Sequence, residues 1–162
     1  MAEPADGIFE RQEPACAEWL TANPQGFVFL AAPTPVTVTP GVSTTISGAL
    51  VRGGAVSGTV TDAGGSTHGL AHVLVEVSSA STGDHAWAAT TADGSYTARG
   101  LNAAADYQVC FHGSAATGGS SDTAGYVDQC WQNQPTSGTP TQMTLTSGET
   151  TTGINAALVG AG

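Results

Sequence analysis

The sequence contains no lysine and only three arginines against 13 acidic residues, which gives a formal net charge of −10. A protein that binds a phosphate backbone needs a basic surface. We therefore expect no nucleic-acid partner. Only 10% of the 162 residues are charged, and because an acidic, Thr-rich surface suits extracellular chains, we expect a secreted or cell-surface protein.

Long apolar runs are also absent, since no stretch of about 18 consecutive apolar residues occurs. We therefore expect no insertion into a membrane. The first residues, MAEPADG, lack the basic and apolar regions of a signal peptide. We expect Met1 to stand in place of a removed leader.

Catalytic motifs are missing as well. The sequence has no nucleophile elbow, no histidine-rich metal motif, no phosphate-binding loop and no carboxylate pair with local support. We expect a protein without enzymatic activity and without a cofactor.

Short segments of alternating polarity, separated by Gly-rich turns, fill residues 53–159. This pattern predicts an all-β, antiparallel sandwich of about seven strands, each with one face toward the core. The positions expected to face inward are Val56, Val60, Val73, Val75, Val77, Tyr96, Ala98, Tyr107, Val109, Phe111, Ile154, Ala156 and Leu158.

Residues 36–50, VTVTPGVSTTISGAL, are similar to residues 143–158, MTLTSGETTTGINAAL. The offset is 107 residues up to Gly148 and 108 after one extra residue, Gly153. A period of this length indicates tandem domains, because solenoid repeats measure about 20–50 residues. We expect a segment over 1–52 that holds a partial repeat and a sandwich domain over 53–162. Chance similarity between two Thr-rich hairpins is the alternative.

The partial repeat needs a partner, because a lone hairpin is marginally stable in water. Its expected inward residues are Val36, Val38, Ile46 and Leu50. The candidate partners are the segment 1–32, in which GIFERQ and GFVFLAA are expected strands, the flank of the main sandwich, or another molecule. We favour a contact between molecules, so other copies or neighbouring repeats are the expected partners.

These segments carry a family resemblance. AVSGTVTDAGGSTHGLAHVLVEV, TTADGSYTARGL and YQVCF together resemble the carboxypeptidase regulatory-like domain, a prealbumin-like β-sandwich related to the B-type repeats of collagen adhesins. Residues 125–158 resemble the second half of long-repeat versions in secreted actinobacterial proteins. The resemblance implies a prealbumin-like Greek-key sandwich over about 53–159, but no particular function. Adhesin repeats often carry a Lys–Asn isopeptide crosslink, which a lysine-free chain cannot form.

Two of the three cysteines flank a Gly/Ser-rich excursion, HGSAATGGSSDTAG. A disulfide between Cys110 and Cys130 would fasten this excursion to the sheet and stabilise the fold by about 3 kcal/mol. In the alternative, Cys110 is a nucleophile and His112, on the same strand face, is its base, but no orienting group is visible nearby. We favour the disulfide. Cys16 pairs with a cysteine outside this sequence, pairs between molecules, or stays free.

Candidate metal ligands are few. His68 and His72 are four residues apart in a turn that enters a strand, not on a helix, so we expect them to be exposed turn residues. Asp62, Asp93 and Asp106 lie at strand ends, where calcium could gather them. Asp-Gly is also a common turn sequence. We expect no metal ion, with the three aspartates as the calcium alternative.

Three aromatic residues, Trp87, Tyr126 and Trp131, are candidates for stacking on sugar rings. Amide and acidic side chains next to Trp131 could bond sugar hydroxyls. The competing interpretation is that Trp131 packs over the disulfide at the edge of the core, because large aromatic side chains are mostly buried.

The sequence therefore favours a structural or adhesive module of an extracellular repeat protein. A carbohydrate-binding module with a glycan partner is the second hypothesis. A fibre subunit that assembles by strand pairing between molecules is the third.

Overall fold

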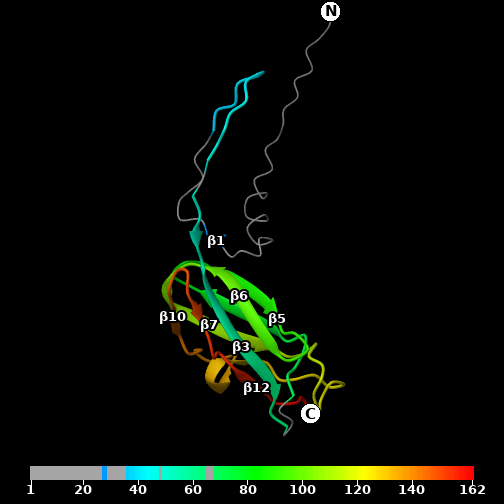
Figure 1. The fold of residues 1–162 in the computed structure, drawn as a ribbon. Coiled ribbons are helices and arrows are strands. Elements are labelled where there is room, and N and C mark those ends of the chain that lie inside the picture. The colour runs from blue at the N-terminus through cyan, green and yellow to red at the C-terminus, as the bar shows by residue number, and fades with distance from the viewer. Residues whose placement is uncertain (1–26, 29–35, 48, 65–67) are drawn as a thin grey trace, which may run out of the picture.

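β-Strands and turns make up the fold that the computed structural model describes, which comprises residues 27–28, 36–47, 49–64 and 68–162 (Figure 1). One short 3-10 helix, η1, spans Trp131–Asn133. Within these residues, no helix is long and apolar enough to cross a membrane. Cys16, the expected strand GIFERQ and the greater part of GFVFLAA lie outside the described residues.

Two sheets form the sandwich. The larger sheet has the order β5 (His85–Ala89), β4 (Leu74–Ser79), β7 (Ala104–His112), β8 (Gln129–Cys130) and β9 (Gln134–Pro135), and β10 (Met143–Leu145) also pairs with β7. The smaller sheet is centred on β3 (Gly54–Asp62), which pairs with β6 (Ser95–Leu101), β11 (Thr150–Thr151) and β12 (Ala156–Leu158). Seven of these strands have three or more residues, and the predicted all-β sandwich is confirmed.

The core lies between the two sheets and is built by alternation along each strand. On β4 and β7, inward residues such as Val75, Val77, Val109 and Phe111 are fully buried, while their neighbours in sequence face outward. Every position expected from the sequence to face inward is buried: Val56, Val60, Val73, Val75, Val77, Tyr96, Ala98, Tyr107, Val109, Phe111, Ile154, Ala156 and Leu158.

One pairing was not anticipated from the sequence. β11 and β12 run parallel to β3, whereas the other strand pairs of the two sheets are antiparallel. The first and last strands of the sandwich therefore lie side by side and point the same way (Figure 1). Parallel neighbours need a crossover, and here the rest of the sandwich supplies it.

Residues 143–158, which we name the closing segment, belong to both sheets. β10 pairs with β7 in the larger sheet, and β11 and β12 pair with β3 in the smaller one. The buried side chains of Met143, Leu145, Ile154 and Leu158 enter the core from this segment. The hydroxyl of Tyr96 on β6 donates a buried hydrogen bond to the carbonyl of Ile154 at 2.8 Å. The closing segment therefore joins the two sheets along one side.

Residues 36–50, which we name the arm, precede β3 and project away from the sandwich (Figure 1). At the base of the arm, β1 (Phe27–Val28) pairs with β2 (Val51–Arg52). The expectation that residues 36–50 form two strands is not met, since residues 36–47 and 49–50 contain a turn but no strand. No strand of the described residues pairs with this segment.

Gly58 on β3 lies tightly against the backbone of the closing segment. A Cβ atom at this position would lie 2.0 Å from the carbonyl oxygen of Ile154. We expect Gly58→Ala to lower the free energy of unfolding by at least about 2 kcal/mol, because the two backbones would have to separate. Chemical denaturation measures the loss. Gly138→Ala is the matched control, since its nearest atoms lie at 3.4 Å in an exposed turn. Equal stability of the two variants would contradict the close approach of the two backbones at Gly58.

Candidate functional site: the outer face of the larger sheet

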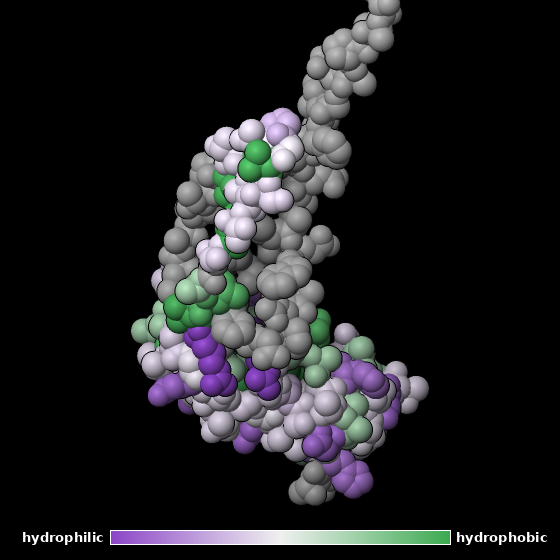
Figure 2. Space-filling model, turned by 45° about the horizontal axis from the view of Figure 1, so that its top comes forward, coloured by the Kyte–Doolittle hydropathy of each residue, from purple (hydrophilic) through white to green (hydrophobic). Residues whose placement is uncertain are grey.

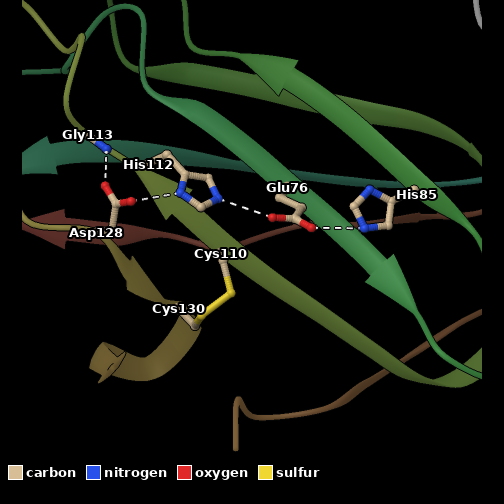
Figure 3. A network of polar contacts seen from close by, with 7 residues as sticks. All are labelled: Glu76, His85, Cys110, His112, Gly113, Asp128 and Cys130. Carbon is tan, nitrogen blue, oxygen red and sulfur yellow. Dashed lines mark hydrogen bonds and ion pairs between the residues drawn. A yellow bond between two sulfur atoms is a disulfide. The ribbon is translucent and has the colours of Figure 1, made fainter. Parts of the chain in front are cut away.

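A row of ionisable side chains crosses the outer face of the larger sheet (Figure 3). Strand register positions it: Glu76 on β4 lies opposite Trp87 on β5 and opposite Cys110 on β7. His85 and His112 occupy diagonal positions on the two neighbouring strands, within reach of the Glu76 side chain. The row thus combines residues that are far apart in sequence.

Glu76 is the centre of the row. Its Oε1 atom lies 2.9 Å from Nε2 of His85, and its Oε2 atom lies 3.2 Å from Nε2 of His112. On the far side of His112, Nδ1 lies 2.8 Å from Oδ2 of Asp128. The other oxygen of Asp128 accepts a hydrogen bond from the backbone N–H of Gly113 at 2.9 Å. Two imidazoles and two carboxylates therefore alternate along the row.

This geometry favours the charged form of His112. Both ring nitrogens face carboxylate oxygens, and an imidazole can donate from both nitrogens only when it is protonated. Partial burial acts to lower the pKa of His112, but hydrogen bonds to Asp128 and Glu76, with the negative charge of both groups, raise the pKa above its usual value.

The predicted disulfide between Cys110 and Cys130 lies beside this row, where β7 pairs with β8. The two residues are direct register partners with Cα atoms 3.8 Å apart. The alternative of a nucleophilic Cys110 with His112 as its base is wrong for this structure. The sulfur is bonded to Cys130, and both nitrogens of His112 face carboxylates.

The sequence alone does not reveal Glu76 and Asp128 as partners of His112, or His85 as the second partner of Glu76. The alternation of β4 does place Glu76 on the outer face, but only cross-strand register shows that His112 lies beside it. Asp128 is 16 residues beyond His112 and returns to it by way of the excursion. Neither the Glu76–His112 contact nor the His112–Asp128 contact can be recognised from a local sequence motif.

The Gly/Ser-rich excursion after β7, expected to depend on the disulfide for its attachment, is also fastened by hydrogen bonds. Oδ2 of Asp62 accepts from the backbone N–H of Ser120 at 2.7 Å and from its hydroxyl at 2.5 Å. The hydroxyl of Tyr126 lies 3.3 Å from the same oxygen. A bridge between Ala71 and Thr117 adds backbone pairing. Two ends of the excursion are thus tied to the sheet and its middle to Asp62.

The calcium candidates Asp62, Asp93 and Asp106 do not come together in the structure. Among the described residues, no group of three or more histidine, cysteine, aspartate or glutamate side chains could hold a metal ion. Each of the three carboxylates is instead bonded by hydroxyls and backbone N–H groups. Those of Asp93 come from its own turn, those of Asp62 mainly from the excursion, and those of Asp106 from the end of β4 and the residues that follow it. The first hydroxyl partners are those of Ser120 for Asp62, Thr91 for Asp93 and Ser79 for Asp106.

These hydrogen bonds favour the ionised carboxylates. The Ser120 hydroxyl, with backbone N–H groups, lowers the pKa of Asp62 to about 2. The Thr91 hydroxyl, with contacts to Ser95, lowers the pKa of Asp93 to about 2. The pKa of Asp106 is also lowered, first by the Ser79 hydroxyl. The aspartates therefore act as anchors of loops and turns. The stabilising contribution of Asp62 and Asp93 is complete above about pH 4 and is lost as the pH falls toward 2.

The turn histidines lie apart from the row. His68 and His72 are both exposed, and Nδ1 of His72 lies 3.0 Å from the hydroxyl of Thr117.

The three aromatic candidates for sugar binding do not share a surface. Tyr126 is 3% exposed, so the expectation that its ring could stack on a sugar is wrong. Burial follows from the bond between its hydroxyl and Asp62 and from its packing in the core. Trp131, in η1, is partly buried against the core. Trp87 is 49% exposed on the edge strand β5 and is the most exposed of the three.

Trp87 lies beside the ionisable row, on the edge strand β5. Its ring centroid is 5.7 Å from those of both His85 and His112. Glu76 is its cross-strand neighbour. The row and Trp87 therefore form one polar surface with an aromatic side chain at its edge.

No protein-family model matches this chain, and no curated protein matches it.

The raised pKa of His112 predicts a pH dependence of stability. A folded-state pKa above the unfolded value of 6.5 adds stability that is complete below pH 6.5 and is lost as the pH rises through the raised value. We expect His112→Gln to flatten the fall in unfolding free energy above pH 6.5. Urea titrations at a series of pH values measure it. His68→Gln, at an exposed turn, should keep the wild-type curve. A His112→Gln curve parallel to that of the wild type would contradict the assignment.

Proposed function

We propose that the chain is a non-catalytic module of an extracellular repeat protein, and that it acts as a spacer that resists tension between its two ends. The observation that carries this proposal is the parallel pairing of the first and last strands of the sandwich, β3 with β11 and β12.

The direction of force follows from the topology. The chain enters the sandwich at the start of β3 and leaves it after β12, at the opposite end of the sandwich (Figure 1). Because the two strands are parallel neighbours, tension on the ends slides one strand along the other. The hydrogen bonds between them are then strained together, whereas a pull across a hairpin strains them one after another.

These bonds extend over the length of β3. The backbone N–H of Ala55 donates to the carbonyl of Glu149 at 2.9 Å, and that of Ala63, just beyond β3, donates to Leu158 at 2.9 Å. Between them, Oδ1 of Asn155 accepts from the backbone N–H of Thr59 at 2.9 Å and from its hydroxyl at 3.2 Å. Both ends and the middle of the strand are thus held by the closing segment.

The disulfide limits how far the chain can extend under tension. Disulfides form and persist mainly in oxidising compartments, so the Cys110–Cys130 bond is compatible with an extracellular location. The crosslink encloses residues 110–130, and a chain pulled from its ends cannot extend these residues while the bond is intact. In a lysine-free chain, this bond takes the place of an isopeptide as the covalent reinforcement.

Single-molecule pulling through residues 53 and 162 tests the proposal. We expect one distinct unfolding event at a force that falls in Asn155→Ala, because forced unfolding follows the unfolding rate and this variant weakens the strained interface. Ser114→Ala, exposed and outside this interface, is the control. Reduction of the disulfide should lengthen the unfolded chain by about 70 Å, since 20 residues at about 3.5 Å each are released. Gradual extension without a distinct event would contradict the proposal.

A second candidate function rests on Trp87. Its exposed ring, with His85, Glu76 and His112 beside it, combines a stacking face with groups that can bond sugar hydroxyls. We propose glycan binding on this surface as the alternative to a purely structural role.

A glycan array distinguishes the two functions. We expect binding in the wild type, a loss of at least about tenfold in affinity in Trp87→Ala, and little change in Leu74→Ala. Leu74 is the matched control because it is 43% exposed on the same face. Absence of glycan binding in the wild type, or equal binding by Trp87→Ala, would contradict this alternative.

A further inference from the structure

The arm exposes the same kinds of side chain that the closing segment buries. Val36 and Val38 are 37% and 72% exposed, and Ile46 and Leu50 are 69% and 39% exposed. Figure 2 shows apolar atoms in green on the surface of the projecting arm. Their counterparts in the closing segment are all at most 8% exposed: Met143, Leu145, Ile154 and Leu158.

The two segments also share a backbone turn. The N–H of Val42 donates to the carbonyl of Thr39 at 3.2 Å, and the N–H of Glu149 donates to that of Thr146 at 3.3 Å. The third residue of each turn is a glycine, Gly41 or Gly148, and each has a φ of 78°. Glycine at a positive φ in the third position, followed by this hydrogen bond, is typical of a type II turn. The sequence similarity therefore extends to local structure.

The site where such a segment packs is seen once in this chain, at the edges of β7 and β3. The closing segment places its first strand against Tyr107 and Ala104 of β7, turns, and then follows β3 from Ala55 to Asp62. It needs the free edges of two strands that belong to facing sheets. An isolated β-hairpin or a flat apolar surface does not supply both edges.

We propose that residues 36–50 are the closing segment of a preceding sandwich of the same type. The partner of the arm is a two-sheet framework equivalent to residues 53–141, and Val36, Val38, Ile46 and Leu50 enter its core. This inference rests on the proposed function, in that both place the chain in a tandem array.

The sandwich of the same chain is not that partner. Its own closing segment, residues 143–158, already pairs with β7 and β3. Because this segment belongs to the same sandwich, it acts at a high effective concentration. The arm leads into the next sandwich with only three residues, 51–53, between Leu50 and β3. A closing segment so close to the following domain would couple two neighbouring sandwiches with little freedom to rotate.

A tandem protein tests the inference. A copy of residues 53–141 is joined directly to residue 35 of the chain, so that the arm is the only segment available to close the first sandwich. We expect two unfolding events per molecule in single-molecule pulling. A tandem with two complete sandwiches, residues 53–158 followed by 51–162, is the positive control and should also give two events.

The matched negative control carries Val36→Ser, Val38→Ser, Ile46→Ser and Leu50→Ser in the arm-closed tandem, and we expect one event from it. One event from the unmodified arm-closed tandem, with two from the positive control, overturns the inference. Two events from the serine variant overturn it as well, because closure would then not depend on the four apolar residues. The number of events tests the arm, whereas the force of each event tests the proposed spacer function, so the two can fail separately.

Discussion

The parallel pairing of β3 with β11 and β12 is the constraint on which the rest of this structure depends. Residues 143–158 contact both sheets, and their side chains complete the core from one side. Gly58 leaves no room for a side chain against the backbone of Ile154, and the Tyr96 hydroxyl bonds the same segment from β6. A sandwich without this segment would leave the edge of β3 and one side of the core open to water.

The larger sheet carries its polar chemistry on the opposite side from the core. Glu76 and Asp128 hold His112 between them, and the Cys110–Cys130 bond joins the neighbouring strands. Each buried side-chain nitrogen and oxygen among the described residues has a hydrogen-bond partner. Among the described residues, carboxylates such as Asp62, Asp93 and Asp106 hold loops and turns in place.

The alternating strands and their inward residues could be predicted from the sequence, because a period of two is local information. The disulfide could also be predicted, since Cys110 and Cys130 flank an excursion that must return to the sheet. The parallel direction of β12 could not, because it depends on which edge of β3 remains free after β6 has paired. The contact between Glu76 and His112 depends on register across strands, and the burial of Tyr126 depends on Asp62, 64 residues away. Such relations arise only when the sheets have formed.

The order of the strands also restricts when this protein can fold during its synthesis. β3 is the first strand of the sandwich to be made and β12 the last, with Val60 and its partner Ala156 separated by nearly the whole domain. At about 5–20 residues per second, the edge of β3 waits roughly 5–20 s for its partner. Contacts between distant residues also form slowly. A ribosome-bound chain therefore carries an unfinished sandwich with an unpaired strand edge until β12 has been made.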